Sequence, residues 1–124
     1  MSENSSKKLL DSVVLGIEDL KGEDVTVLDL REIENAVCDY FVVCTGNSNT
    51  QVSSIANSIE RTVRKENKER PISVEGKDNA MWVLLDYASV VVHVFQRNVR
   101  EYYDIESMWG DAKTINVQPE KSVE

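Results

Sequence analysis

The stretch that offers the most chemistry is a glycine turn followed by small polar side chains, CTGNSNTQV from Cys44 to Val52. A glycine between a buried strand and a helix N-terminus can bring backbone amides and the helix dipole to a phosphate group. One glycine matches neither of the established glycine-rich phosphate motifs, and Ser48 and Gln51 have the spacing of a helix capping box. We therefore favour a helix cap. The alternative is a nucleotidyl- or phosphotransferase site on the turn Gly46–Gln51.

A transfer enzyme of that kind needs clustered carboxylates on neighbouring strands, because hard metal cations take oxygen ligands. The later strand-like segments offer only Asp86 and His93. Asp86 precedes the turn YAS and is expected to accept hydrogen bonds within it. His93, the single histidine, lacks the partners of a metal site or a nucleophile–base pair, so we predict a structural role. We predict no catalytic, cofactor-binding or metal-binding site and no enzymatic activity.

The two cysteines, Cys38 and Cys44, do not have the spacing of a metal-ligand pair. An unpaired cysteine behaves as a small hydrophobic residue. We predict that both are buried free thiols.

The 124 residues fit one domain, which we predict over residues 1–112, followed by a mobile tail over 113–124. The formal charge of −8 repels a phosphate backbone and disfavours direct, sequence-specific nucleic-acid binding. No apolar run reaches the length of a membrane span, and the N-terminus lacks a secretory pattern. These features predict a cytoplasmic protein without a membrane partner.

Hydrophobic periodicity predicts helices over residues 9–20, 49–63 and 98–109, and strands over 25–30, 40–45, 71–75, 80–86 and 90–95. The continuously apolar segment 40–45 is typical of a central strand covered on both faces. The order of elements predicts an α/β fold, a mixed sheet of about five strands with helices packed on it.

The predicted hairpin of strands 80–86 and 90–95 carries large apolar side chains on both faces. Strand alternation sends Trp82, Leu84 and Asp86 to one face and Val83, Leu85 and Tyr87 to the other. The last helix adds further large side chains on more than one side: Tyr102, Tyr103, Met108 and Trp109. Aromatic residues and methionine beside arginine are favoured at protein interfaces. We predict a protein contact surface here; the alternative is that these residues only fill the core.

Four segments, DYFVVCTGNSNTQV, VEG, WVLLDYASVVVHVF and REYYDIESMWGDA, together resemble the Iojap-like ribosomal silencing factor family in order and spacing. The resemblance runs from about Leu9 to Ala112. It implies a nucleotidyltransferase-like fold without the catalytic carboxylates. It also implies a translation repressor that binds the large ribosomal subunit through ribosomal protein L-fourteen and sterically blocks joining of the small subunit, mainly in starvation or stationary phase. Members of the family are typically homodimers when free.

The resemblance also implies which residues touch the partner. They are Trp82, Leu84, Asp86, Tyr87, Arg100, Tyr103, Met108 and Trp109, with Trp82 and Tyr103 as the anchors. An acidic chain suits a protein landing site within a negatively charged RNA surface. One departure is Ala88-Ser89, where family members commonly have Gly-Asp, so a positive φ at this turn would strain the alanine. A third hypothesis is a scaffold that acts only through homodimerisation.

Overall fold

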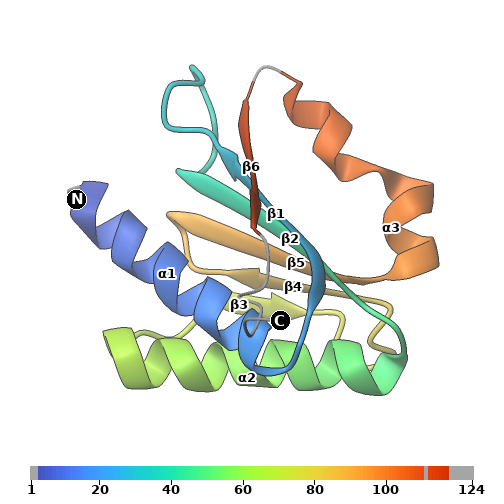
Figure 1. Ribbon diagram of the computed structural model, residues 1–124. Coiled ribbons are helices and arrows are strands. Elements are labelled where there is room, and N and C mark those ends of the chain that lie inside the picture. Colours follow the sequence, from blue (N-terminus) through green and yellow to red (C-terminus); the bar gives the residue numbers. More distant parts are fainter. Residues whose placement is uncertain (1–2, 111, 118–124) are drawn as a thin grey trace, which may run out of the picture.

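The computed structural model describes residues 3–110 and 112–117, which form a six-stranded mixed sheet with helices on both faces (Figure 1). The helices are α1 (Glu3–Asp19), α2 (Asn49–Asn67), α3 (Arg97–Tyr103) and the 3-10 helix η1 (Ile105–Trp109). The strands are β1 (Glu23–Asp29), β2 (Tyr40–Gly46), β3 (Ser73–Glu75), β4 (Trp82–Asp86), β5 (Val90–Gln96) and β6 (Lys113–Val117). The predicted α/β class with a mixed sheet is confirmed.

The sheet has the strand order β3-β4-β5-β2-β1-β6. Its central pair, β2 and β5, is parallel, whereas every other neighbouring pair is antiparallel. All seven residues of β2 are buried, as expected of a strand covered on both faces. The chain leaves β2 through α2 and returns through β3 and the hairpin β4–β5, so β5 comes to lie beside β2.

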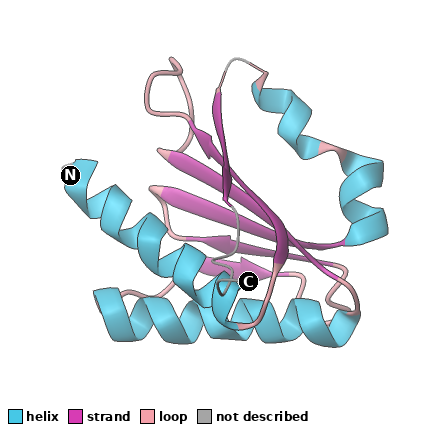
Figure 2. Ribbon diagram, in the orientation of Figure 1, coloured by secondary structure: helices cyan, strands magenta, loops and turns pink. Residues whose placement is uncertain are grey.

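Helices α1 and α2 pack side by side on one face of the sheet, and α3 lies on the other face (Figure 2). The apolar stripes of the two long helices meet the inward side chains of the strands in one large core. The two helices touch closely at Gly16, where a Cβ atom would lie 2.8 Å from the Cα atom of Ile59. The hydroxyl of Ser58 donates to the carbonyl oxygen of Gly16 at 2.8 Å. Glycine is therefore required where the helices cross.

The face that carries α3 has a second, smaller apolar cluster. Its buried members are Leu28, Leu30, Cys38, Phe41, Val43, Phe95, Val99 and Ile105. Only Val99 of these residues belongs to α3, and Ile105 belongs to η1. This face is therefore covered by a short helix and by loops rather than by a long amphipathic helix.

The structure differs from the sequence prediction at the C-terminal end. Residues Lys113–Val117 pair antiparallel with β1 as an edge strand, so the predicted mobile tail is wrong for these residues. The β-branched residues Thr114 and Ile115 favour a strand, but Lys113, Thr114 and Ile115 are all exposed, so this part of the segment has no buried face that would indicate one. The part of the predicted tail over residues 118–124 lies outside the described residues.

The predicted last helix is also divided into two. Asp104 has a φ of 47°, a left-handed conformation that ends α3 at Tyr103 and precedes η1. The backbone amide of Asp104 donates to the carbonyl oxygen of Arg100 at 2.8 Å, which closes the end of the helix.

Candidate protein contact surface

The glycine turn at the start of α2 is a helix cap. The hydroxyl of Ser48 accepts a hydrogen bond from the amide of Gln51 at 3.1 Å. The Oε1 atom of Gln51 in turn accepts from the amide of Asn47 at 2.7 Å. A Cβ atom on Gly46 would lie 2.9 Å from the side chain of Val52, so glycine lets α2 approach the strand. The predicted cap at Ser48 is confirmed, but Gln51 accepts from Asn47 and not from the N-cap amide of a standard capping box; the two bonds occupy two of the amides that a phosphate cradle would use.

Strand β4 presents the predicted alternation. Trp82, Leu84 and Asp86 are half-buried on the face that carries α3, whereas Val83 and Leu85 are buried under α1 and α2. The indole of Trp82 stacks on the ring of Phe95 with 4.8 Å between centroids. Trp82 therefore has one side fixed against the smaller cluster and remains partly open to solvent.

His93 on β5 fixes the orientation of the indole. The Nε1–H group of Trp82 donates to Nδ1 of His93 at 2.9 Å. Burial lowers the pKa of His93 to about 4, because the surroundings disfavour the charged imidazolium. A neutral ring leaves Nδ1 free to accept the hydrogen bond. The predicted structural role of His93 is consistent with this geometry.

Two tyrosines at the end of α3 extend the aromatic surface. The ring of Tyr103 lies 5.0 Å from the ring of Trp82, and Tyr102 meets Tyr103 edge to face, also at 5.0 Å. Tyr103 is 52% exposed and Tyr102 is 81% exposed. We call Trp82, Leu84, Asp86, Tyr102 and Tyr103 the Trp82 surface. It combines five side chains from β4 and α3.

An open groove of about 630 Å³ runs beside the Trp82 surface, between α3 and the loop that precedes β4. Gly76 shapes this loop: its φ is +90°, and a Cβ atom there would lie 2.0 Å from the carbonyl oxygen of Trp82. Any side chain at this position would displace the backbone that carries the indole. Met81, 43% exposed, also lines the groove.

Asp86 closes the turn between β4 and β5. Its Oδ1 atom accepts from the amide of Ala88 at 2.8 Å, which confirms the turn hydrogen bond expected from the sequence. Ala88 has a φ of +73°, in the left-handed region that favours glycine. The strain anticipated for alanine at this turn is therefore present.

Tyr87 does not lie on the Trp82 surface. Its side chain is 5% exposed and packs in the large core with α1 and α2. Burial raises the pKa of Tyr87. The alternation predicted for β4 already sends residue 87 to the face opposite Trp82, so its assignment to the same contact surface is wrong.

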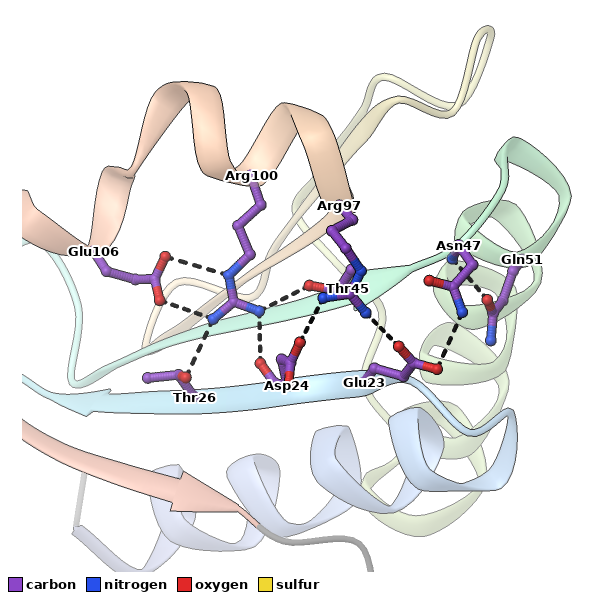
Figure 3. Close-up of polar contacts among 9 residues, drawn as sticks. All are labelled: Glu23, Asp24, Thr26, Thr45, Asn47, Gln51, Arg97, Arg100 and Glu106. Carbon is purple, nitrogen blue, oxygen red and sulfur yellow. Dashed lines mark hydrogen bonds and ion pairs between the residues drawn. The ribbon is translucent and has the colours of Figure 1, made fainter.

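Arg100 belongs to a polar network that ties α3 to β1 and β2 (Figure 3). Its Nη1 atom donates to the carbonyl oxygen of Asp24 at 2.6 Å and to the hydroxyl of Thr45 at 2.8 Å. Its Nη2 atom donates to Thr26 at 3.2 Å and to Glu106 at 2.8 Å. The side chain is 13% exposed. Arg100 therefore makes its contacts within the molecule and does not form part of the exposed surface around Trp82.

Two of the predicted contact residues, Met108 and Trp109, belong to η1. Met108 is 71% exposed and is not among the residues that line the groove beside Trp82. The side chain of Trp109 lies outside the part of the chain that is described in detail. The structure therefore brings together Trp82, Leu84, Asp86 and Tyr103 from the predicted set. Beside them lie Tyr102, which belongs to the aromatic group predicted on the last helix, and Met81, whose large apolar side chain next to Trp82 is the signal available in the sequence.

Reactive groups are sparse in the part of the chain that the structure describes. Cys38 and Cys44 are buried free thiols, as predicted, and burial raises their pKa values to about 11 and about 12. Residues 3–110 and 112–117 contain no cluster of three or more histidine, cysteine or acidic side chains arranged to hold a metal ion. Among the described helices, none combines the length and apolar character needed to cross a membrane.

The geometry defines a small α/β protein with a partly exposed aromatic surface beside a short helix that polar contacts hold on the sheet. Comparison with known proteins identifies the family. The family described as "Ribosomal silencing factor during starvation" matches residues 3–124. The ribosomal silencing factor of Bacillus subtilis is 42% identical over 108 residues, which are 87% of this chain and 90% of that protein. That of Halalkalibacterium halodurans is 38% identical over 114 residues, 92% of this chain and 96% of that protein.

A crystal structure of a Chromobacterium violaceum protein has a TM-score of 0.78 and 33% identity, covering 95% of this chain and 92% of that one. The fold and the sequence therefore agree over nearly the whole chain. The chain belongs to the ribosomal silencing factor family.

Proposed function

We propose that this protein represses translation by binding the large ribosomal subunit through ribosomal protein L-fourteen, so that the small subunit cannot join. The observation that carries the proposal is the Trp82 surface. Trp82 and Tyr103 lie with ring centroids 5.0 Å apart on the less covered face of the sheet. Tryptophan and tyrosine at the centre of an interface commonly dominate its binding energy.

The charge of the chain supports a protein rather than an RNA landing site. A formal charge of −8 disfavours contact with ribosomal RNA, so contact with a ribosomal protein is proposed to provide the specificity. Starvation or stationary phase, when subunit joining is to be limited, is the proposed setting. The cytoplasm is the proposed location.

The proposed activity is binding without catalysis. The alternative, a nucleotidyl- or phosphotransferase at Gly46–Gln51, finds less support because Ser48 and Gln51 use the amides of the turn for capping. Calorimetric titration with nucleoside triphosphate and magnesium separates the two. Micromolar binding with turnover would support the transferase.

Self-association is the second proposed use of the Trp82 surface. Exposed aromatic rings also suit a homodimer of the free protein, so dimerisation and ribosome binding are proposed to compete. A dimer cross-linked through its interface that still bound ribosomes normally would refute this competition. A scaffold that acts only as a homodimer would have an activity independent of ribosomes.

The decisive experiment sediments the purified protein with isolated large subunits and then adds small subunits. The protein is expected to travel with the large subunit and to reduce the yield of whole ribosomes. A protein that stays at the top of the gradient at low and moderate salt, with unchanged assembly, contradicts the proposal.

Alanine variants then locate the contact. Trp82→Ala is expected to weaken binding to the large subunit by about 2 kcal/mol, roughly 30-fold. Leu15→Ala is the matched control, because Leu15 is 50% exposed on α1, on the opposite face of the sheet. Melting temperatures of both variants are measured in parallel. A loss of stability without a loss of affinity would make Trp82 a core residue.

A further inference from the structure

Helix α3 carries Tyr102 and Tyr103 but has little apolar attachment of its own. It has seven residues, and Val99 is its single buried residue. A helix of this length is not stable alone in water. Something other than a hydrophobic stripe must therefore hold α3 on the sheet.

The guanidinium of Arg100 supplies that attachment. It has five N–H groups, and each has an acceptor within the described residues. Nε donates to Glu106 at 3.3 Å, and the other four bonds reach Glu106, Thr26, Thr45 and the carbonyl oxygen of Asp24. Figure 3 shows this side chain between α3 and the two strands. One residue thus joins α3, η1, β1 and β2.

Strand β1 is shaped to receive the guanidinium. Its pairing with β2 shifts register between Glu23 and Thr26, so that two residues of β1 oppose one residue of β2. Asp24, within this irregularity, has a φ of +49°, and its carbonyl oxygen accepts from Arg100. The hydroxyl of Thr45, which is fully buried, accepts from the same guanidinium. The carbonyl oxygen exposed by the irregularity and the buried hydroxyl therefore both bind the guanidinium of Arg100.

Arg100 also lies one helical turn before the aromatic contact. Its carbonyl oxygen accepts from the amide of Asp104, which closes α3 directly after Tyr103. Residues three apart on a helix lie on the same side. Fixing Arg100 on the strands therefore fixes the direction in which Tyr103 leaves the helix toward Trp82.

We propose that Arg100 is a positioning residue: it holds α3 on the sheet so that Tyr103 packs against Trp82 and the Trp82 surface has its binding shape. The binding part of this inference rests on the proposed function. Arg100 thus acts on the partner through Tyr103 and not by touching it. The outer arginine, Arg97, pairs with Glu23 and Asp24 but is 44% exposed, so its pairs are solvent-screened and contribute less.

The test compares Arg100→Met with Arg97→Met as the matched control, both in a Trp109→Phe background that leaves Trp82 as the single tryptophan. Near-ultraviolet circular dichroism and fluorescence then report the surroundings of Trp82. Arg100→Met is expected to shift the Trp82 signal toward that of a Tyr103→Ala variant. Arg97→Met is expected to leave the signal unchanged.

Binding to large subunits gives the second readout, with Trp109 retained. Arg100→Met is expected to weaken binding at least 10-fold, and Tyr103→Ala by a similar factor. If Arg100 acts through Tyr103, the double variant loses no more than the stronger single variant. Losses that multiply, together with an unchanged Trp82 signal, would overturn the proposal.

Two further variants cover the case in which Arg100→Met does not fold. Arg100→Lys keeps the charge but has three donors on one atom, so it is expected to restore binding only in part. Glu106→Gln removes the charged partner and is expected to shift the Trp82 signal partially. Full binding and an unchanged signal in both would contradict the inference. If the unmodified protein does not bind large subunits, the proposed function fails, whereas the Trp82 signal still tests positioning.

Discussion

The two faces of the sheet are built in different ways. Under α1 and α2, the inward residues of β4 and β5, among them Val83, Leu85 and Val92, are completely buried. On the opposite face, Trp82 and Leu84 of the same strand are only half-buried. At β4 one face therefore belongs to a closed core, whereas the other, although Phe95 and Val43 are buried on it, keeps Trp82 and Leu84 within reach of solvent.

The helices on the two faces are also held on the sheet in different ways. Helix α2 has 19 residues and buries six of them, whereas α3 has seven residues and buries one. Apolar packing holds the first, and the hydrogen bonds of Arg100 hold the second. Partly exposed aromatic side chains grouped beside such a helix are typical of a surface that another molecule covers. The closed core and the proposed contact surface thus lie on opposite faces of one sheet.

The largest expected effect comes from two neighbouring leucines of β4 that point to opposite faces. Leu85→Ala is expected to lower the free energy of unfolding by about 3 kcal/mol, because it leaves a cavity in the closed core. Leu84→Ala is expected to cost about 1 kcal/mol or less, since its side chain is half-buried. Urea unfolding of both variants measures the difference.

Affinity for the large subunit is expected to show the reverse order, with Leu84→Ala the weaker binder. The slope of unfolding free energy against urea must stay the same in both variants for the comparison to hold. Equal losses of stability at the two positions would mean that the two faces are equally covered, against the contrast drawn from burial.

Much of this contrast is predictable from the sequence, because a strand repeats every two residues and a helix about every 3.6. The alternation of β4, the fully covered strand β2 and the cap at Ser48 follow from such local patterns. Periodicity separates the faces but does not say which one a helix covers. The sequence prediction places Tyr87 on the contact surface although it alternates away from Trp82, and the structure buries it.

Other features depend on contacts between distant parts of the chain. The clamp of Arg100 needs the irregularity of β1 at Asp24, which lies 76 residues earlier. Strand β6 has five residues and forms only by pairing with β1 at the far edge of the sheet. No local pattern encodes either contact, so neither the structural role of Arg100 nor the sixth strand was predicted.

The second-largest expected effect is a loss of stability at low pH through His93, which is buried on the face that carries α3. The pKa of His93 falls from 6.5 to about 4 on folding, so the unfolded chain binds more protons than the native protein between these values. Stability is therefore fully present above pH 6.5 and is lost as the pH falls toward 4. Between pH 7 and pH 5 the loss is expected to be about 2 kcal/mol, measured by urea unfolding at each pH.

The control is His93→Asn, whose Oδ1 atom can accept from the indole of Trp82 without titrating in this range. Because His93 is the single histidine, this variant is expected to have a nearly flat stability between pH 7 and pH 5. If stability falls equally with pH in both proteins, the pH dependence belongs to carboxylates and not to the buried His93.

The smallest expected effect concerns the turn that joins β4 to β5, whose strands carry side chains on both faces of the sheet. Ala88 has a φ of +73°, which costs an alanine about 1–2 kcal/mol. Ala88→Gly removes this strain but adds freedom to the unfolded chain, so a net gain of about 0.5 kcal/mol is expected, or about 2 °C in melting temperature. Ala80→Gly is the control, because Ala80 also has a positive φ, 56°, but is 4% exposed and loses core packing on substitution. A gain at residue 88 without a change in affinity would show that the turn strain is independent of the Trp82 surface, whereas a change in affinity would connect the turn to the contact face through Asp86.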